Sequence, residues 1–177
     1  MSLLEESFEA PAPALAPLSA APPTPIQTFQ LRREIGGLPT ELVLQTFDDR
    51  IFVVVTQSGK VGCLTQASLP PVHQLLAPPA SAPGDAKLAA LPPPPASIAL
   101  TPLLGSPPDA ALHDLYVSQI ATLVWWALQL VHAPRRAVVV GLALKRIGEG
   151  VTDEERARFG GVMDMVAAWP GPQQSSR

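Results

Sequence analysis

Three histidines are the residues that could most readily hold a metal ion or move a proton near neutral pH. His73 lies in a proline-rich stretch, whereas His113 and His132 lie near the two ends of an apolar stretch with helical spacing. No second His or Cys and no cluster of carboxylates stands at ligand spacing from any of them. We therefore expect no metal site. His113 is expected to face solvent or a neighbouring element, and His132 to act as a favourable cation at a helix C-terminus.

Other residues with catalytic potential also stand in patterns that favour a structural role. Asp48 and Asp49 could form an acid and base pair, but adjacent acidic residues are a frequent turn composition. Ser58 lacks the glycine pattern and the strand-to-helix context of a nucleophile elbow. Gly59 and Lys60 have no glycine five residues earlier and no helix pattern after them, which argues against a phosphate-binding loop. The sequence predicts a protein that is not an enzyme and binds no cofactor.

The composition is that of one ordinary domain with no bias toward nucleic acid. The chain has 177 residues, of which 47% are apolar, and a net charge of −3. Its single cysteine, Cys63, can form no intramolecular disulfide, which fits a reducing compartment. Residues 1–9 are acidic and lack the positive start and long apolar core of a secretory signal. The expected location is the cytoplasm, with the nucleus as a second compartment.

The 22 prolines divide the chain into a part that can pack and parts that we expect to be disordered. A Pro/Ala-rich arm covers residues 1–27, and a proline-rich docking segment is the alternative to a solvated spacer there. Residues 68–95 carry nine prolines and are expected to be a disordered insertion. The single folded domain is predicted over 28–169, and 170–177 is expected to be a disordered tail.

The stretch Arg50–Gly62 is predicted to contain the central strand of the fold. Its valine run, Val53 to Val55, has the β-branched composition of a strand that is buried on both faces. An unpaired carboxylate at Val54 should therefore abolish folding. Ser58 and Gly59 then predict a tight two-residue hairpin turn, after which the chain returns as the next strand, 60–65.

Further strands are predicted from alternating or short apolar stretches. Strict alternation over 28–35 and a second stretch over 40–47 are joined by a turn at 36–39. With loops of two to four residues, the first four strands predict an antiparallel meander. A fifth strand is expected over 96–104, where Pro102 favours a sheet edge. A further strand over 137–144 is apolar throughout and expected near the sheet centre.

Two helices are predicted from apolar spacing and from capping residues. The first begins after Asp109, a plausible N-cap, and continues to Val131. Its apolar part is too short and carries too many polar residues for a membrane span, so no membrane association is expected. The second begins at Thr152, which can accept from the Glu155 amide while the Glu155 carboxylate reaches back to Thr152, and it ends at Pro170.

Several segments resemble the proteasome assembly chaperone 3 family. The most recognisable one runs from the valines through Thr56, Gln57, Gly59, Lys60, Gly62 and Leu64, and it is preceded by Gly37-Leu-Pro-Thr40. Downstream, 99–105, a long apolar helix, 136–145 and a final helix follow in the order of that family's elements. The resemblance implies a small α+β fold. This is an antiparallel β-sheet of about six strands, a meander plus two later strands, with two α-helices packed on it.

The resemblance also implies a function and partners. Members of that family pair with a sister chaperone of similar fold, proteasome assembly chaperone 4. They bind proteasome alpha-type subunit 5 and help to build the alpha ring of the 20S proteasome. A homodimer is the other dimeric form to consider. Without the resemblance, a roadblock-like or longin-like adaptor in trafficking or signalling is the alternative, because a meander flanked by helices serves many interaction modules.

No residue-level binding motif transfers with the resemblance, so the candidate partner-binding residues rest on physical arguments. Trp125, Trp126 and Leu130 add apolar area to the first helix beyond its main stripe, and such area on a surface helix favours a dimer contact. Burial of both tryptophans in the core is the equal alternative. Lys60, near the predicted hairpin tip, is a candidate contact for the proteasome subunit, although an exposed lysine on a turn often stays solvated.

Overall fold

The computed structural model describes residues 26–71, 73–78, 90–145 and 152–172. These residues form six strands and two helices. In chain order the elements are β1 (Gln27–Ile35), β2 (Leu38–Thr46), β3 (Arg50–Thr56), β4 (Cys63–Ser68), β5 (Ala99–Leu104), α1 (Ala110–Leu130), β6 (Ala137–Ala143) and α2 (Asp153–Ala167). The predicted α+β class, with about six strands and two helices, is confirmed.

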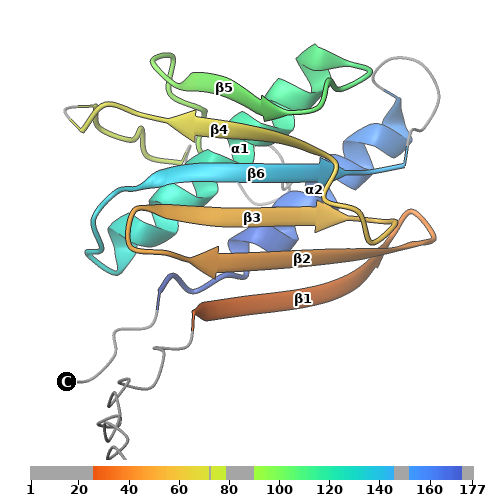
Figure 1. Ribbon diagram of the computed structural model, residues 1–177, viewed down its shortest axis with the longest axis horizontal. Coiled ribbons are helices and arrows are strands. Elements are labelled where there is room, and N and C mark those ends of the chain that lie inside the picture. The colour runs from red at the N-terminus through yellow and green to blue at the C-terminus, as the bar shows by residue number, and fades with distance from the viewer. Residues whose placement is uncertain (1–25, 72, 79–89, 146–151, 173–177) are drawn as a thin grey trace, which may run out of the picture.

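The strands form one sheet in the order β1-β2-β3-β6-β4-β5 (Figure 1). β1, β2 and β3 are the predicted antiparallel meander. The predicted hairpin between β3 and β4 is wrong, because β6 lies between them, parallel to β3 and antiparallel to β4. The sheet is therefore mixed, and β5, with Pro102, forms an edge as expected.

The loop from β3 to β4 crosses the end of β6 and is shaped by Gly62. This residue has a φ of 73°, and a Cβ there would lie 1.8 Å from the backbone oxygen of Leu142 in β6. Only glycine permits both the positive φ and this approach. The glycines after the valine run thus serve a crossover loop, and not the two-residue turn that they predict.

Both described helices pack on one face of the sheet, which is the far face in Figure 1. The core lies between them and alternate residues of the central strands, among which Ile51, Val53, Val55, Val138 and Val140 are each 0% exposed. Fully burying one such side chain contributes about 1.5 to 3 kcal/mol. This helix-covered layer is therefore the main source of stability for the fold.

The two helices begin where the sequence predicts. The Asp109 side chain accepts from the amide of Leu112, and the Thr152 hydroxyl accepts from the amide of Glu155. The capping box also predicts that the Glu155 carboxylate accepts from the Thr152 amide. In the structure this carboxylate accepts instead from the Tyr116 hydroxyl, at 2.7 Å, and from Arg158. This carboxylate therefore links α2 to α1.

The expected burial of the valine run on both faces is only half right. Val53 and Val55 point to the helices and are fully buried, but Val54 and Phe52 point to the other face and are half-buried. No described element covers that face (Figure 1). An acidic residue is therefore expected to abolish folding at Val53 or Val55, and not at Val54.

Parts of the predicted arm, insertion and tail lie outside the described residues, so their disorder stays a prediction. The described ends of the insertion contact the domain: Leu69 and Leu75 belong to the core, and the Pro92 carbonyl accepts from the Gln119 side chain at 2.9 Å. Among the described residues, no helix is long and apolar enough to cross a membrane.

Candidate partner-binding surface

The face of the sheet opposite the helices, here called the open face, carries an apolar strip across its centre. The register places Val43 beside Val54, and Phe52 beside Val139. Leu64 of β4 lies next to Gly141 on the same face. Val43, Phe52, Val54 and Leu64 are half-buried, whereas Val139 and Gly141 are buried. The strip is thus made of strand residues that prefer burial and lack a covering layer.

Polar side chains border the apolar strip on both sides. On β1 and β2, Arg32 and Glu41 are cross-strand partners, with an Arg32 Nη1 to Glu41 Oε1 distance of 3.5 Å. Gln45 of β2 and Gln66 of β4 occupy the rows beside Phe52 and Val139. An apolar centre with a polar border is the usual anatomy of a protein interface.

One end of the sheet brings together residues that stand far apart in the sequence. The Gln57 side chain donates to the Thr40 hydroxyl at 3.0 Å and accepts from the Lys145 amide at 2.9 Å. Nearby, the Thr56 hydroxyl accepts from the amides of Ser58 and Lys60. These bonds fix the crossover loop against the ends of β2 and β6, so its exposed residues form a preorganised surface at the right of Figure 1.

Two groups of buried polar side chains lie on the helix side and are engaged within the fold. His113 is 8% exposed, contrary to the solvent-facing alternative, and its Nε2 lies 3.0 Å from the Thr65 hydroxyl. Burial lowers the pKa of His113, and the neighbouring Asp114 opposes this shift. Tyr116 and Glu155 are 2% exposed, and burial, followed by the hydrogen bond to Glu155, raises the pKa of Tyr116. Both groups hold helices in place through hydrogen bonds between buried side chains.

The acidic pair at the β2 to β3 turn is also engaged. Arg50 Nε donates to Asp49 Oδ2 at 2.8 Å, and this hydrogen bond lowers the pKa of the exposed Asp49 carboxyl. In the described part of the chain, no group of three or more His, Cys, Asp or Glu side chains could hold a metal ion. The open face, with its partly exposed apolar strip, is the candidate surface for function.

Comparisons with known proteins show a likeness among solved structures. No protein-family model matches the chain, and no curated protein matches it. Among solved structures, the chain is similar to one from a chaperone complex for 20S proteasome assembly in yeast, at 14% identity and a TM-score of 0.49. The match covers 80% of this chain and 100% of that chain.

Three of the four sequence-predicted partner residues lie apart from the open face. Trp125 is 1% exposed in the core, where its indole N–H donates to the Arg136 carbonyl at 2.8 Å. Trp126 is half-buried against the core, and Leu130 is 73% exposed at the end of α1. These three are therefore on the helix layer, whereas Lys60 is exposed on the crossover loop. Contacts of Leu130 and Lys60 with partners stay predictions.

Sequence reasoning missed the open face, although a signal for it exists. In β2 and β4, alternate residues form a buried row and a row that mixes polar and apolar side chains. Val43 and Leu64 are apolar residues of the mixed row. Together with Val54 they mark a second apolar row across three strands. The row can be recognised only when the strand order and register are known, because β6 separates β3 from β4.

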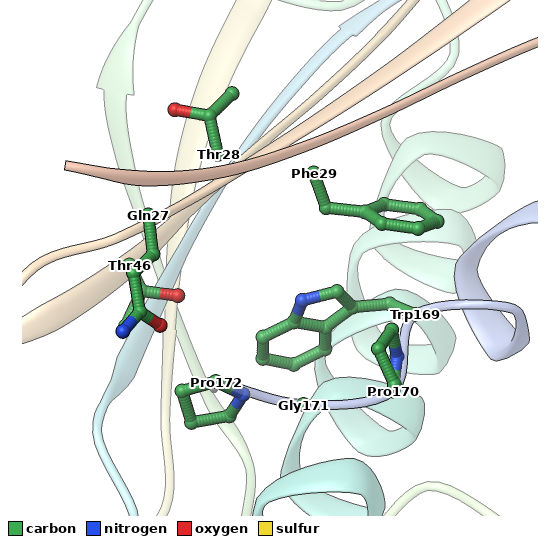
Figure 2. A pocket seen from close by; sticks show the side chains of 8 residues that line it. All are labelled: Gln27, Thr28, Phe29, Thr46, Trp169, Pro170, Gly171 and Pro172. Carbon is green, nitrogen blue, oxygen red and sulfur yellow. The ribbon is translucent and has the colours of Figure 1, made fainter. Parts of the chain in front are cut away.

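A hollow beside β1 is too small to be an alternative site for a ligand. Figure 2 shows Trp169 and Phe29 side by side above Pro170 and Pro172, with Gln27 and Thr46 on the other side. Its volume is about 180 Å³, below the roughly 300 to 1,000 Å³ of ordinary ligand pockets. Trp169 is 5% exposed, so its main role is to close the core under β1.

Proposed function

We propose that this protein is a non-enzymatic chaperone for assembly of the 20S proteasome alpha ring and that it acts as one half of a dimer. The observation that supports a dimer is the apolar strip of the open face. Val54 and Phe52 belong to the same central strand as the fully buried Val53 and Val55, yet no described element covers them. A second protein layer would complete their burial.

A sheet of the same fold is the partner that fits this face. Six strands about 4.8 Å apart, each with about seven residues rising about 3.3 Å, span roughly 650 Å². A standard interface buries about 800 Å² per partner, so the whole sheet face and its border are needed. Two sheets stack face to face with interdigitated side chains, and a sister chaperone similar to proteasome assembly chaperone 4 would supply such a face.

The proposed client is proteasome alpha-type subunit 5, and the support for it is the sequence resemblance. The residues that carry the resemblance, Thr40, Thr56, Gln57 and Lys60, gather at one end of the sheet through the hydrogen bonds described above. Binding there needs no catalytic group. A chaperone of this kind holds a subunit in its assembly-competent form through differential affinity and leaves when later subunits compete.

The dimer is tested by placing a charge in the apolar strip. Val54→Asp should give a folded chain that no longer associates with a second copy or with the sister chaperone, measured by light scattering after gel filtration. Leu115→Asp is the matched control, because Leu115 is 48% exposed on α1, on the helix side of the sheet. A Val54→Asp chain that still dimerises would exclude the open face as the interface.

The client is tested by recovering the tagged protein from cells that are making proteasomes. We expect alpha-type subunit 5 among the bound proteins, and we expect Lys60→Glu to reduce its recovery without affecting the dimer. Recovery of a small GTPase or coat component in place of any proteasome subunit would favour the adaptor alternative and contradict the chaperone function.

A further inference from the structure

The crossover loop, residues 57–62, lies partly on the open face of the sheet. Gly141 of β6 is paired with Val54, so a side chain at position 141 would point to the open face. A Cβ at Gly141 would lie 2.8 Å from the carbonyl oxygen of Val61 and 3.0 Å from its Cγ1. Val61 therefore rests on Gly141, and a glycine in the strand is what permits this close approach.

Val61 extends the apolar strip of the open face. The same Cβ position at Gly141 lies 3.1 Å from Cδ2 of Leu64, so the side chains of Val61 and Leu64 are neighbours above β6. Val61 is 44% exposed, and Leu104, the partner of Leu64 on β5, is 62% exposed. Because the loop stands above the level of the strands, a partner sheet that covers Val54 and Leu64 also meets Val61.

The area of the sheet face supports the same contact. The six strands span a face of roughly 650 Å², which is smaller than the about 800 Å² that a standard interface buries on each partner. The loop stands on this face and adjoins the apolar strip, so it supplies part of the missing area. Val61 thus belongs to the surface that a dimer partner covers.

Two lysines stand directly beside this contact. Lys60 precedes Val61, and its amide donates to the Thr56 hydroxyl at 3.1 Å. The Lys145 amide donates at 2.9 Å to the side chain of Gln57, the residue after Thr56. The backbones of both lysines are thereby held at the same end of the sheet, and both residues are exposed.

The two lysines have the chemistry of a contact for acidic groups. Among the described residues, no Asp or Glu forms an ion pair with Lys60 or Lys145. Charges at the border of an interface attract partners of opposite charge and disfavour partners of like charge. The surface beside Val61 therefore fits a protein with an acidic patch.

The size of an ordinary interface makes this surface a shared one. An interface of about 800 Å² per partner is a patch about 30 Å across. Lys60 and Val61 are adjacent in the chain, so their Cα atoms are only about 3.8 Å apart. A protein that docks on the lysines of a chain whose Val61 is covered by its dimer partner must therefore touch that partner as well.

We propose that the client binds a composite surface, made by Lys60 and Lys145 of this chain and by the dimer partner that covers Val61 beside them. The client brings acidic residues to the lysines, and only the dimer presents the complete surface. Dimerisation and client binding are thus coupled through adjacent residues of one loop. This inference rests on the proposed chaperone function and adds which form of the protein binds the client, and by what chemistry.

The test uses the tagged full chain as isolated from cells, together with its dimer partner. Dimerisation is measured by light scattering after gel filtration, and binding of recombinant proteasome alpha-type subunit 5 by biolayer interferometry. Val54→Asp leaves the loop and both lysines unchanged, yet it should abolish the dimer and weaken subunit binding by about tenfold or more. Val61→Asp should do the same, whereas Leu115→Asp, on the helix side, should preserve both properties.

Variants of the lysines separate the two halves of the composite surface. Lys60→Glu and Lys145→Glu should each keep the dimer and weaken subunit binding by about tenfold. Added NaCl should weaken binding to the wild-type dimer, because it screens exposed charges, and should have a smaller effect on either lysine variant. Circular dichroism shows whether each variant is folded. If Val54→Asp does not fold, Val61→Asp decides, because Val61 is exposed.

The proposal is overturned if a folded, monomeric Val54→Asp or Val61→Asp chain binds the subunit as tightly as the wild-type dimer does. A Val61→Asp chain that still dimerises, or lysine variants with wild-type affinity for the subunit, would overturn it as well. All these results leave the chaperone function standing. A wild-type dimer that binds no alpha-type subunit would instead contradict that function, and the composite surface with it.

Discussion

The two faces of the sheet are made by the same strands but have different neighbours. On the helix side, Val53 and Val55 of β3 and Val140 of β6 are fully buried by α1 and α2. On the open face, Val54 and Phe52 are apolar but only half-buried. The comparison shows that apolar residues occur on both faces of the sheet, whereas the described helices cover one face. The first side stabilises the fold, and the second is available for association.

The strongest test of this difference places the same charge on each face of β3. Val53→Asp should prevent folding, because an unpaired buried carboxylate costs several kcal/mol against a total stability of about 5 to 15 kcal/mol. Val54→Asp should leave a cooperatively melting chain. Circular dichroism and thermal melting of both variants measure the contrast. Equal loss of folding in the two variants would mean that the faces are not different in the isolated chain.

The next effect concerns the buried Glu155–Arg158 ion pair of α2, whose carboxylate also accepts from Tyr116 of α1. Glu155→Ala leaves the Arg158 guanidinium, which is 5% exposed, without its carboxylate and removes the acceptor of the Tyr116 hydroxyl. We expect a loss of about 3 to 5 kcal/mol in the free energy of unfolding, measured by urea denaturation.

The matched control for the ion pair is Asp153→Ala, on the same helix. Asp153 pairs with Arg156 on the surface, where both side chains are largely exposed. An exposed pair contributes roughly 0 to 1 kcal/mol, so this variant should be nearly neutral. A small effect of Glu155→Ala, comparable with the control, would contradict a role of the pair in holding the cover.

A smaller effect is expected from pH, through His113 of α1, which contacts Thr65 of β4. Burial lowers its pKa, so at a pH below the ordinary value of 6.5 the unfolded chain binds more protons than the folded one. The free energy of unfolding should therefore fall from pH 7.5 to pH 5.5, by at most about 1.4 kcal/mol per pH unit for one proton. His113→Gln, which can still reach the Thr65 hydroxyl, should flatten this dependence in urea unfolding. An unchanged slope would assign it to other groups.

The smallest effect is at the end of α1, where the cover meets β6. His132 has a positive φ, which costs less free energy for glycine than for other residues. His132→Gly should raise the free energy of unfolding by about 0.5 to 1 kcal/mol, measured as a shift of the urea midpoint. Destabilisation by this variant would show that contacts of the imidazole outweigh the backbone term.

Most of the strands and helices could be predicted, because short-range sequence patterns determine where they form. Alternation identifies β1 and β2, and the side chains of Asp109 and Thr152 identify the starts of α1 and α2. The position of β6 could not be predicted this way, because its insertion between β3 and β4 depends on contacts between segments about 80 residues apart. The glycines near position 60 are compatible with either connection.

The candidate sites could be predicted less well than the fold. Trp125 was a reasonable candidate for a partner contact, but its place in the core depends on the carbonyl of Arg136, which no spacing rule predicts. The open face needs the strand register before its apolar row becomes visible.

The position of β6 has a consequence for the synthesis of this protein on the ribosome. The strands β1, β2 and β3 can pair as soon as they leave the exit tunnel, because each neighbours the next. β4 and β5 have their place in the sheet only after residues 137–143 have emerged and entered between the two halves. Throughout that interval the nascent chain presents the unpaired edge of β3 with its valine run, so the growing polypeptide itself needs protection from aggregation.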